Sequence, residues 1–351
     1  AIIAQSGTIA WVGPASEAPA ADEKVDLGGR AVLPGWVDSH THMVFDGDRS
    51  AEFEARISGG SYEAGGIAVT MDATRQAGTD RLDKLVADRV AAGRRGGTTT
   101  FETKTGYGLN TESEVEAAKV ASRHVDDVTF LGAHLVPPGA DAEEYLDEVV
   151  GPMLEGVAPY VQWIDVFCER GAFNEEQSRR VLEAGKKLGL GLRVHGNQLG
   201  EGPGVALAVE LGAASVDHVN HLTDEDVELL ANSDTVATML PACDLSTREP
   251  LAPGRTLLDA GATLAIASNL NPGTSYTSSM NYCVTTAVLQ QHLSVDEAIH
   301  AATTGGATAL RRHNVGNGLD PQGRPAKGTI VEGAAADLHV LDAPSAVHLA
   351  Y

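Results

Sequence analysis

The sequence has few cysteines and no long apolar runs. Only three of its 351 residues are cysteine, and they lie far apart without Cys-x-x-Cys spacing. Scattered cysteines in an odd number argue against a disulfide framework and against a thiolate zinc site, and they favour reduced thiols in the cytoplasm. Because no apolar run approaches the length that spans a bilayer, we expect no membrane partner.

Basic residues are also scarce. The chain has 25 lysines and arginines against 48 aspartates and glutamates, which gives a formal net charge of −23. Such a negative surface repels nucleic acid and anionic membranes, so neither is an expected partner. Apolar residues make up 43% of the chain, which is enough for a large core and argues against disorder.

The middle of the chain alternates strand-like apolar runs with amphipathic helical segments. Eight such runs predict parallel strands joined by crossover helices, closed into an α/β fold of the (β/α)8 TIM barrel type. Thr111, Asn174 and Thr223 precede acidic first turns and are predicted helix N-caps. The runs are AVLPGWVDSH, GTTTFETKTG, VTFLGAHLV, YVQWIDVFCE, LGLRVHGNQ, ASVDHVNH, TVATMLPA and ATLAIASNLN.

The two ends of the chain share a different pattern, in which short strands are separated by turn residues. We therefore expect a small β-sandwich domain built from residues 1–33 plus 327–351, and a barrel over residues 34–326. The chain begins at Ala1 inside a predicted strand, so we also expect that residues are missing at the N-terminus.

Polar side chains gather where the predicted strands end. Barrel active sites lie at the C-terminal face of the strands, so this clustering predicts the position of a site. His40 and His42 are spaced so that both point to the same side of an extended strand, as two ligands of one metal ion need. His195 ends the fifth run and is the natural third ligand. His218 ends the sixth run. It is predicted either to be a further ligand or to orient the metal-bound water and the attacked carbonyl.

Several segments resemble the imidazolonepropionase family of the amidohydrolase superfamily, and the resemblance covers essentially the whole chain. It implies one zinc or iron ion, a homodimer and a small-molecule substrate with a carboxylate. The implied reaction is hydrolytic ring opening of 4-imidazolone-5-propanoate to N-formimidoyl-L-glutamate in histidine degradation. The segments are HTHMVFDGDRSAEFEAR, ETKTGYGLNTESE, FLGAHLVPP, VHGNQ, VDHVNH and NPGTS.

The resemblance also implies roles for individual residues. A planar guanidinium suits bidentate recognition of the substrate carboxylate, and phenol, imidazole and amide groups suit a polar ring. The implied metal ligands are His40, His42, His195 and Asn269, and the implied catalytic residues are His218 and Asn269. The implied substrate-binding residues are Arg49, Tyr62, Tyr107, His134, Gln198, Asn271, Gly273 and Thr274. Tyr62 is explained equally well as a packing aromatic, and the segment SYEAGG around it is shorter than in the family, which suggests missing residues.

Asn269 departs from the family, which has an aspartate at this position. That aspartate accepts the proton of the attacking water and passes it to the leaving nitrogen, whereas an amide cannot act as a base. We therefore expect impaired turnover, roughly 10²-fold or more below that of an intact site. Three interpretations stay open: a deliberate change that stops the chemistry, a natural protein that only binds, or a reaction in which His218 serves as the base.

Two other functions remain open on this scaffold. One is another mononuclear amidohydrolase, either a deaminase or a cyclic amidase, although an uncharged base would not need Arg49. The fourth run ends DVFCE without the lysine that bridges two metals in binuclear relatives, which favours one metal ion. The other is a non-catalytic binding protein.

Overall fold

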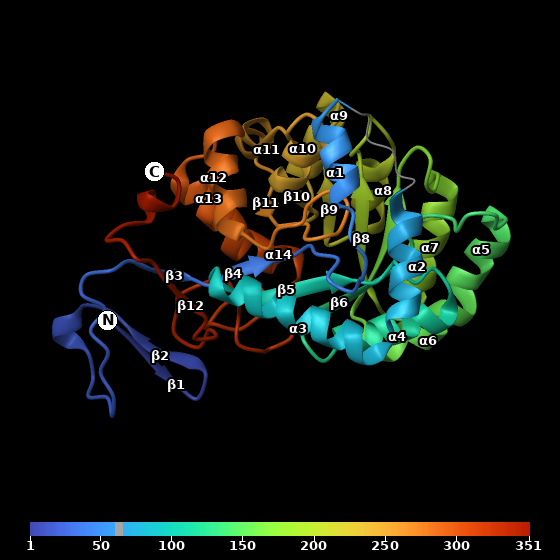
Figure 1. Ribbon diagram of the computed structural model, residues 1–351. Coiled ribbons are helices and arrows are strands. Elements are labelled where there is room, and N and C mark those ends of the chain that lie inside the picture. The colour runs from blue at the N-terminus through green and yellow to red at the C-terminus, as the bar shows by residue number, and fades with distance from the viewer. Residues whose placement is uncertain (60–65) are drawn as a thin grey trace.

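Eight parallel strands form one sheet at the centre of the computed structural model, which describes residues 1–59 and 66–351 (Figure 1). Each of the eight predicted runs contributes one strand, and the strands pair in chain order from β4 to β11. The prediction of a (β/α)8 TIM barrel is therefore confirmed. The strands are β4 Trp36–Asp38, β5 Thr98–Lys104, β6 Asp127–Ala133, β7 Trp163–Cys168, β8 Gly191–Gly196, β9 Ser215–His218, β10 Val236–Met239 and β11 Leu264–Ile266.

The first and last strands of this sheet are joined at the rim by the segments that follow them. The Asn269 N–H donates to the His40 carbonyl at 3.0 Å, and the His42 N–H donates to the Leu270 carbonyl at 2.8 Å. These two backbone bonds continue β4 and β11 beyond their C-terminal ends. Three of the predicted metal ligands, His40, His42 and Asn269, therefore lie on the segments that close the barrel.

The helices lie outside the strands (Figure 1). Asn174 and Thr223 are N-caps, as predicted. The prediction for Thr111 is wrong: Asn110 has an extended backbone and accepts the Ser113 N–H at 2.9 Å, while Thr111 is already helical. Within the described ranges, every helix is too short or too polar to cross a bilayer. The helices are α1 Ser50–Ile57, α2 Ile67–Ala77, α3 Thr79–Arg95, α4 Thr111–Ala121, α5 Ala142–Glu148, α6 Leu154–Val157, α7 Glu175–Lys187, α8 Gly204–Leu211, α9 Asp224–Ala231, α10 Pro241–Thr247, α11 Gly254–Ala260, α12 Met280–Gln290, α13 Val295–His300 and α14 Gly306–Ala309.

The terminal segments form two small antiparallel sheets. Strands β1 (Ile2–Gln5) and β2 (Thr8–Val12) form a hairpin at the lower left of Figure 1, and β3 (Val32–Pro34) pairs with β12 (Leu338–Val340). An isolated bridge joins Thr8 to Ala335, so both ends of the chain meet. The domain boundaries at residues 33/34 and 326/327 stay predictions.

The apolar core lies between the strands and the helices. Gly185 of α7 packs so closely on β7 that an added Cβ would lie 2.3 Å from a methyl carbon of Ile164, and Gly93 of α3 packs in the same way on Phe101. Inside the barrel, by contrast, Lys104 and Arg193 are fully buried. Buried charges are costly unless they are paired, so the barrel interior must supply their partners.

Candidate active site

Three histidines converge at the C-terminal end of the barrel. His40 and His42 follow β4 and His195 lies on β8, and all three are buried. The His42 Nε2 lies 3.2 Å from that of His40 and 3.4 Å from that of His195. Ligands on a tetrahedral metal with bonds of about 2.0–2.1 Å are roughly 3.3 Å apart. The observed spacing therefore fits a metal ion, with which the three can form one site.

Carboxylates on β7 and β9 lie beside the Nδ1 atoms of two of these imidazoles. The His40 Nδ1 lies 2.7 Å from Asp217 Oδ2, and the His195 Nδ1 lies 3.0 Å from Asp165 Oδ2. A carboxylate at Nδ1 selects the tautomer that leaves Nε2 as the metal-facing lone pair. Burial, and then the nearby Lys104 ammonium, hold the pKa of His40 well below its usual value. His40 is therefore neutral at pH 7, as a ligand must be.

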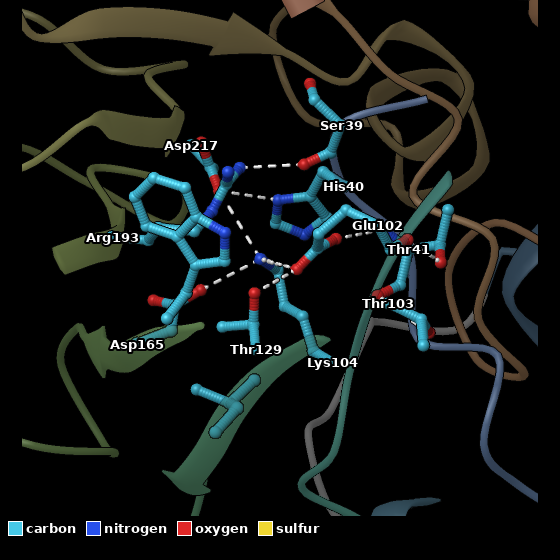
Figure 2. Close-up of polar contacts among 12 residues, drawn as sticks. Ser39, His40, Thr41, Glu102, Thr103, Lys104, Thr129, Asp165, Arg193 and Asp217 are labelled. Atoms are coloured by element: carbon cyan, nitrogen blue, oxygen red, sulfur yellow. Dashed lines mark hydrogen bonds and ion pairs between the residues drawn. The ribbon is translucent and has the colours of Figure 1, made fainter. Parts of the chain in front are cut away.

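Fully buried charged side chains form ion pairs with these two carboxylates inside the barrel (Figure 2). The Lys104 Nζ lies 3.0 Å from Glu102 Oε1, 3.1 Å from Asp165 Oδ2 and 3.8 Å from Asp217 Oδ2. The Arg193 Nη2 lies 3.2 Å from Asp217 Oδ2. Although burial opposes it, the charge of Arg193 and the hydrogen bond with His40 hold the pKa of Asp217 well below its usual value. We call Glu102, Lys104, Asp165, Arg193 and Asp217 the charged layer.

Sequence reasoning did not identify the charged layer as part of the site. A signal was nevertheless present, because Arg193 stands two positions before His195 and Glu102 two positions before Lys104. Side chains two apart on a strand face the same side, so these residues had to point into the barrel one level deeper.

Asn269, the predicted fourth ligand, lies beside His40 on the segment that follows β11. Its backbone is left-handed, with φ of +51°, a conformation that asparagine adopts more readily than most residues. The Oδ1 atom is buried and finds no hydrogen-bond partner in residues 1–59 and 66–351. An amide oxygen in that state is suited to a cation.

His218 lies beside the triad at the end of β9. Its ring centroid is 5.4 Å from that of His195, and its backbone φ is +88°. Burial, and then the neighbouring His195, hold its pKa well below the usual value. A neutral imidazole of low pKa is a weak base, but it remains a hydrogen-bonding group.

A cavity of about 60 Å³ opens above the triad. It brings together most of the predicted site residues, whereas Gly273 and His40 are not among the residues that line it. Tyr62 falls outside the described residues. The apolar lining residues Ile67, Leu135 and Phe167 were not predicted, because no motif distinguishes them from core residues. The lining residues are His42, Arg49, Ile67, Tyr107, His134, Leu135, Phe167, His195, Gln198, His218, Asn269, Asn271 and Thr274.

Arg49, at the start of α1, is held in place by Glu52. Its Nε and Nη2 each donate to a Glu52 carboxylate oxygen at 2.8 Å. Behind it, a Cβ at Gly273 would lie 2.4 Å from the Arg49 Nη1, so a side chain at this position would displace the guanidinium. The Gly273 N–H donates to Asn271 Oδ1, as does that of Thr274, both at 2.8 Å. The structure therefore places Gly273 against the guanidinium, and its substrate contact stays a prediction.

Tyr107 and His134 form the opposite wall. Their ring centroids are 5.5 Å apart at an interplanar angle of 60°. The His134 Nδ1 lies 2.9 Å from the Gly106 carbonyl, so Nδ1 carries the proton and Nε2 is an acceptor. Burial lowers the pKa of His134 to about 4. The wall thus offers an uncharged imidazole beside a phenol.

Solved structures share this architecture. The chain is similar to 5-methylcytosine deaminase from Klebsiella pneumoniae with 5-fluorocytosine (TM-score 0.76, 14% identity, covering 98% of this chain and 88% of that one). It is also similar to a zinc-bound adenosine deaminase from Xanthomonas campestris (TM-score 0.67, 20% identity, covering 97% and 79%). The barrel and the histidine triad therefore define an α/β-barrel protein with a candidate metal site at the C-terminal face of its strands.

Curated proteins give the narrower assignment, although no protein-family model matches the chain. The imidazolonepropionase of Arthrobacter sp. (strain FB24) is 64% identical over all of this chain and 90% of its own length. That of Saccharopolyspora erythraea is 63% identical over all of this chain and 88% of its own length. The chain belongs to the imidazolonepropionase family, so the predicted resemblance is confirmed.

Proposed function

We propose that this protein catalyses hydrolytic ring opening of 4-imidazolone-5-propanoate to N-formimidoyl-L-glutamate, a step of histidine degradation. The observation that carries the proposal is the convergence of three imidazole Nε2 atoms beside a cavity that His42, His195 and Arg49 line. The cavity has the metal site at one end and the Arg49 guanidinium at the other. These two ends suit a substrate with a reacting carbonyl at one side and a carboxylate at the other. The names of the close relatives support the same reaction.

His40, His42 and His195 would hold the metal ion, with the Asn269 Oδ1 as a neutral fourth ligand. When bound, the ion supplies Lewis-acid activation of water and of the ring carbonyl. Zinc and iron both accept imidazole and oxygen ligands. The zinc bound to the adenosine deaminase from Xanthomonas campestris supports zinc.

The remaining wall would bind and orient the substrate. The Arg49 guanidinium, held by Glu52, pairs with the propanoate arm. Tyr107, His134 and Gln198 hydrogen-bond the ring, with the His134 Nε2 accepting a ring N–H. Asn271 and Thr274 contact the amino-acid end of the substrate and product. Fixing both ends brings the ring carbonyl to the metal-facing side of the cavity.

Proton transfer is the weak step in this chain. Asn269 has no basic oxygen, and His218 has a lowered pKa, so neither takes a proton from water efficiently. His218 instead stabilises the oxyanion that develops on the attacked carbonyl. The arrangement therefore supports binding more fully than turnover. This favours ligand binding without catalysis as the second candidate function.

Elemental analysis combined with a ring-opening assay tests the proposal, the assay following the loss of imidazolone absorbance. We expect one zinc or iron ion per chain, and the Asn269→Asp variant should turn over about 10²-fold faster or more, because it restores the base. Absence of turnover in the metal-loaded Asn269→Asp variant would contradict the proposed hydrolysis. Light scattering tests the expected homodimer, and fractionation of the source cells tests the predicted cytoplasmic location.

A further inference from the structure

The loop that carries Tyr107, residues 105–109 between β5 and α4, is held through its backbone by one carboxylate. Glu114 of α4 is fully buried. Its Oε1 accepts the N–H groups of Gly108 at 2.7 Å and Leu109 at 2.9 Å, and its Oε2 accepts that of Gly106 at 2.9 Å. Three charge-assisted bonds from one side chain to three of the five loop residues fix the loop.

The carbonyl edge of the same loop is held from the other side. Arg75 of α2 donates from Nε to the Gly108 carbonyl at 2.6 Å and from Nη2 to the Leu109 carbonyl at 3.1 Å. The loop therefore lies between a carboxylate that accepts its N–H groups and a guanidinium that donates to its carbonyls. We call Glu114 and Arg75 the backbone clamp.

The conformation held by the backbone clamp is one that a free loop would seldom adopt. Leu109 has φ of +48°, which is unfavourable for a residue with a side chain. Gly106 has φ of +110°, and a Cβ there would lie 2.6 Å from the Leu131 carbonyl oxygen. Such a backbone persists only where its surroundings impose it.

Two cavity residues depend on this loop. Tyr107 belongs to it and lines the cavity, and the Gly106 carbonyl fixes the ring of His134 through Nδ1 at 2.9 Å. Gly106 therefore connects the two residues: its N–H donates to Glu114, and its carbonyl accepts from His134. Neither Glu114 nor Arg75 lines the cavity itself.

We propose that Glu114 and Arg75 are positioning residues, which act through Tyr107 and His134 to set the hydrogen-bonding wall for the substrate ring. The inference rests on the proposed function, because it assumes that this wall receives an imidazole-type ring. It assigns the clamp no role at the metal. The ring of His42 stacks on that of His134, with centroids 5.6 Å apart, but the hydrogen bonds of Glu114 and Arg75 go to the backbone of the loop and not to the triad. Loss of the clamp should therefore weaken ligand binding and leave metal affinity unchanged.

Calorimetric titration with imidazole-4-propanoate, a planar ring with the same carboxylate arm, measures this effect without needing turnover. Glu114→Gln keeps the volume but turns an amide NH2 toward a backbone N–H. We expect binding to weaken about tenfold, the cost of about one lost hydrogen bond. Chelator competition should show unchanged metal affinity. Glu112→Gln, an exposed site on the same helix, is the matched control and should bind as the parent does.

A double-mutant cycle separates positioning from general destabilisation. In the Tyr107→Phe/His134→Gln background, Glu114→Gln should weaken binding less than about twofold, because the residues it acts through are already removed. A full tenfold effect in that background would overturn the inference. The partly exposed Arg75→Gln provides a second variant should Glu114→Gln not fold, with a smaller, about threefold, effect that disappears in the same background.

The outcomes also separate this inference from the proposed function. A parent that binds the probe while Glu114→Gln and Arg75→Gln bind it equally well overturns only the backbone clamp. A parent that holds its metal but does not bind the probe contradicts the proposed substrate, and the inference falls with it. An equal loss of metal affinity in Glu114→Gln would show a structural role instead.

Discussion

The metal side and the substrate side of the cavity are built by different means. On the metal side, side chains from strands carry the ligands, and the buried charges of Asp165, Asp217 and Lys104 orient them. On the substrate side, loops carry Tyr107 and Asn271, and backbone hydrogen bonds set their conformation. On a strand, every second side chain points to the same side, so the strand itself sets the direction of a ligand. A loop has no such repeat, and its backbone is held by individual hydrogen bonds.

The difference predicts how each side fails. A change in the charged layer leaves a desolvated charge without its partner, so it costs stability or metal affinity. A change on the substrate side removes contacts that are equally strong in the bound substrate and in the transition state. The loss of such contacts raises KM and leaves kcat unchanged. Each variant below reports on one side only.

Lys104→Met should have the largest effect. It removes the ammonium that pairs with Glu102 and Asp165, and breaking a buried pair costs about 3–5 kcal/mol. Urea unfolding should therefore show a fall of that order in the free energy of unfolding. Lys84→Met removes a lysine of α3 whose side chain is 75% exposed, and it should change stability by less than about 0.5 kcal/mol. Equal stability of the two variants would show that the charged layer is not needed for the fold.

Asp217→Asn should have the next largest effect, on the metal rather than on the fold. An amide still reaches the His40 Nδ1 but no longer offers a negative charge to it or to Arg193. Loss of a carboxylate that orients a ligand costs about 10- to 100-fold in metal affinity. Competition with a chelator measures this, and the exposed Asp224→Asn on α9 is the control. Unchanged affinity would mean that the strand alone orients His40.

The same contrast explains how much of the molecule was predictable from its sequence. Strand runs and their end residues obey a two-residue period, so the barrel and the positions of His40, His42 and His195 followed from pattern. The prediction of Asn269 as the fourth ligand came from the resemblance to the family, and so did the observation that the family has an aspartate at this position. The pairing of eight strands in chain order then brought these residues together.

Loop geometry and buried partners could not be predicted in this way. The packing of Gly273 on Arg49 is one example, because the position of this glycine depends on an Asn271 side chain that accepts its N–H. Glu52 and Glu114 look like ordinary helix-surface acids in sequence, and only the fold shows which backbone or guanidinium they meet. Local pattern gives a residue's direction, whereas its partner depends on the tertiary structure.

Arg49→Lys should have the smallest effect of the three, and it tests the substrate side. Lysine keeps the charge but loses the planar fork, so a bidentate carboxylate pair becomes a single contact. In the Asn269→Asp background we expect KM to rise about tenfold with kcat nearly unchanged. The exposed Arg95→Lys at the end of α3 is the control.

Two probes show whether the effect of Arg49→Lys arises at the carboxylate. Imidazole-4-propanoate should bind about tenfold more weakly to Arg49→Lys, because it carries the arm that the guanidinium holds. 4-Methylimidazole, which lacks the carboxylate, should bind equally to both proteins. If both probes weakened alike, Arg49 would be supporting the cavity wall through Glu52 rather than recognising the substrate, and the cationic end of the proposed site would have to be sought elsewhere.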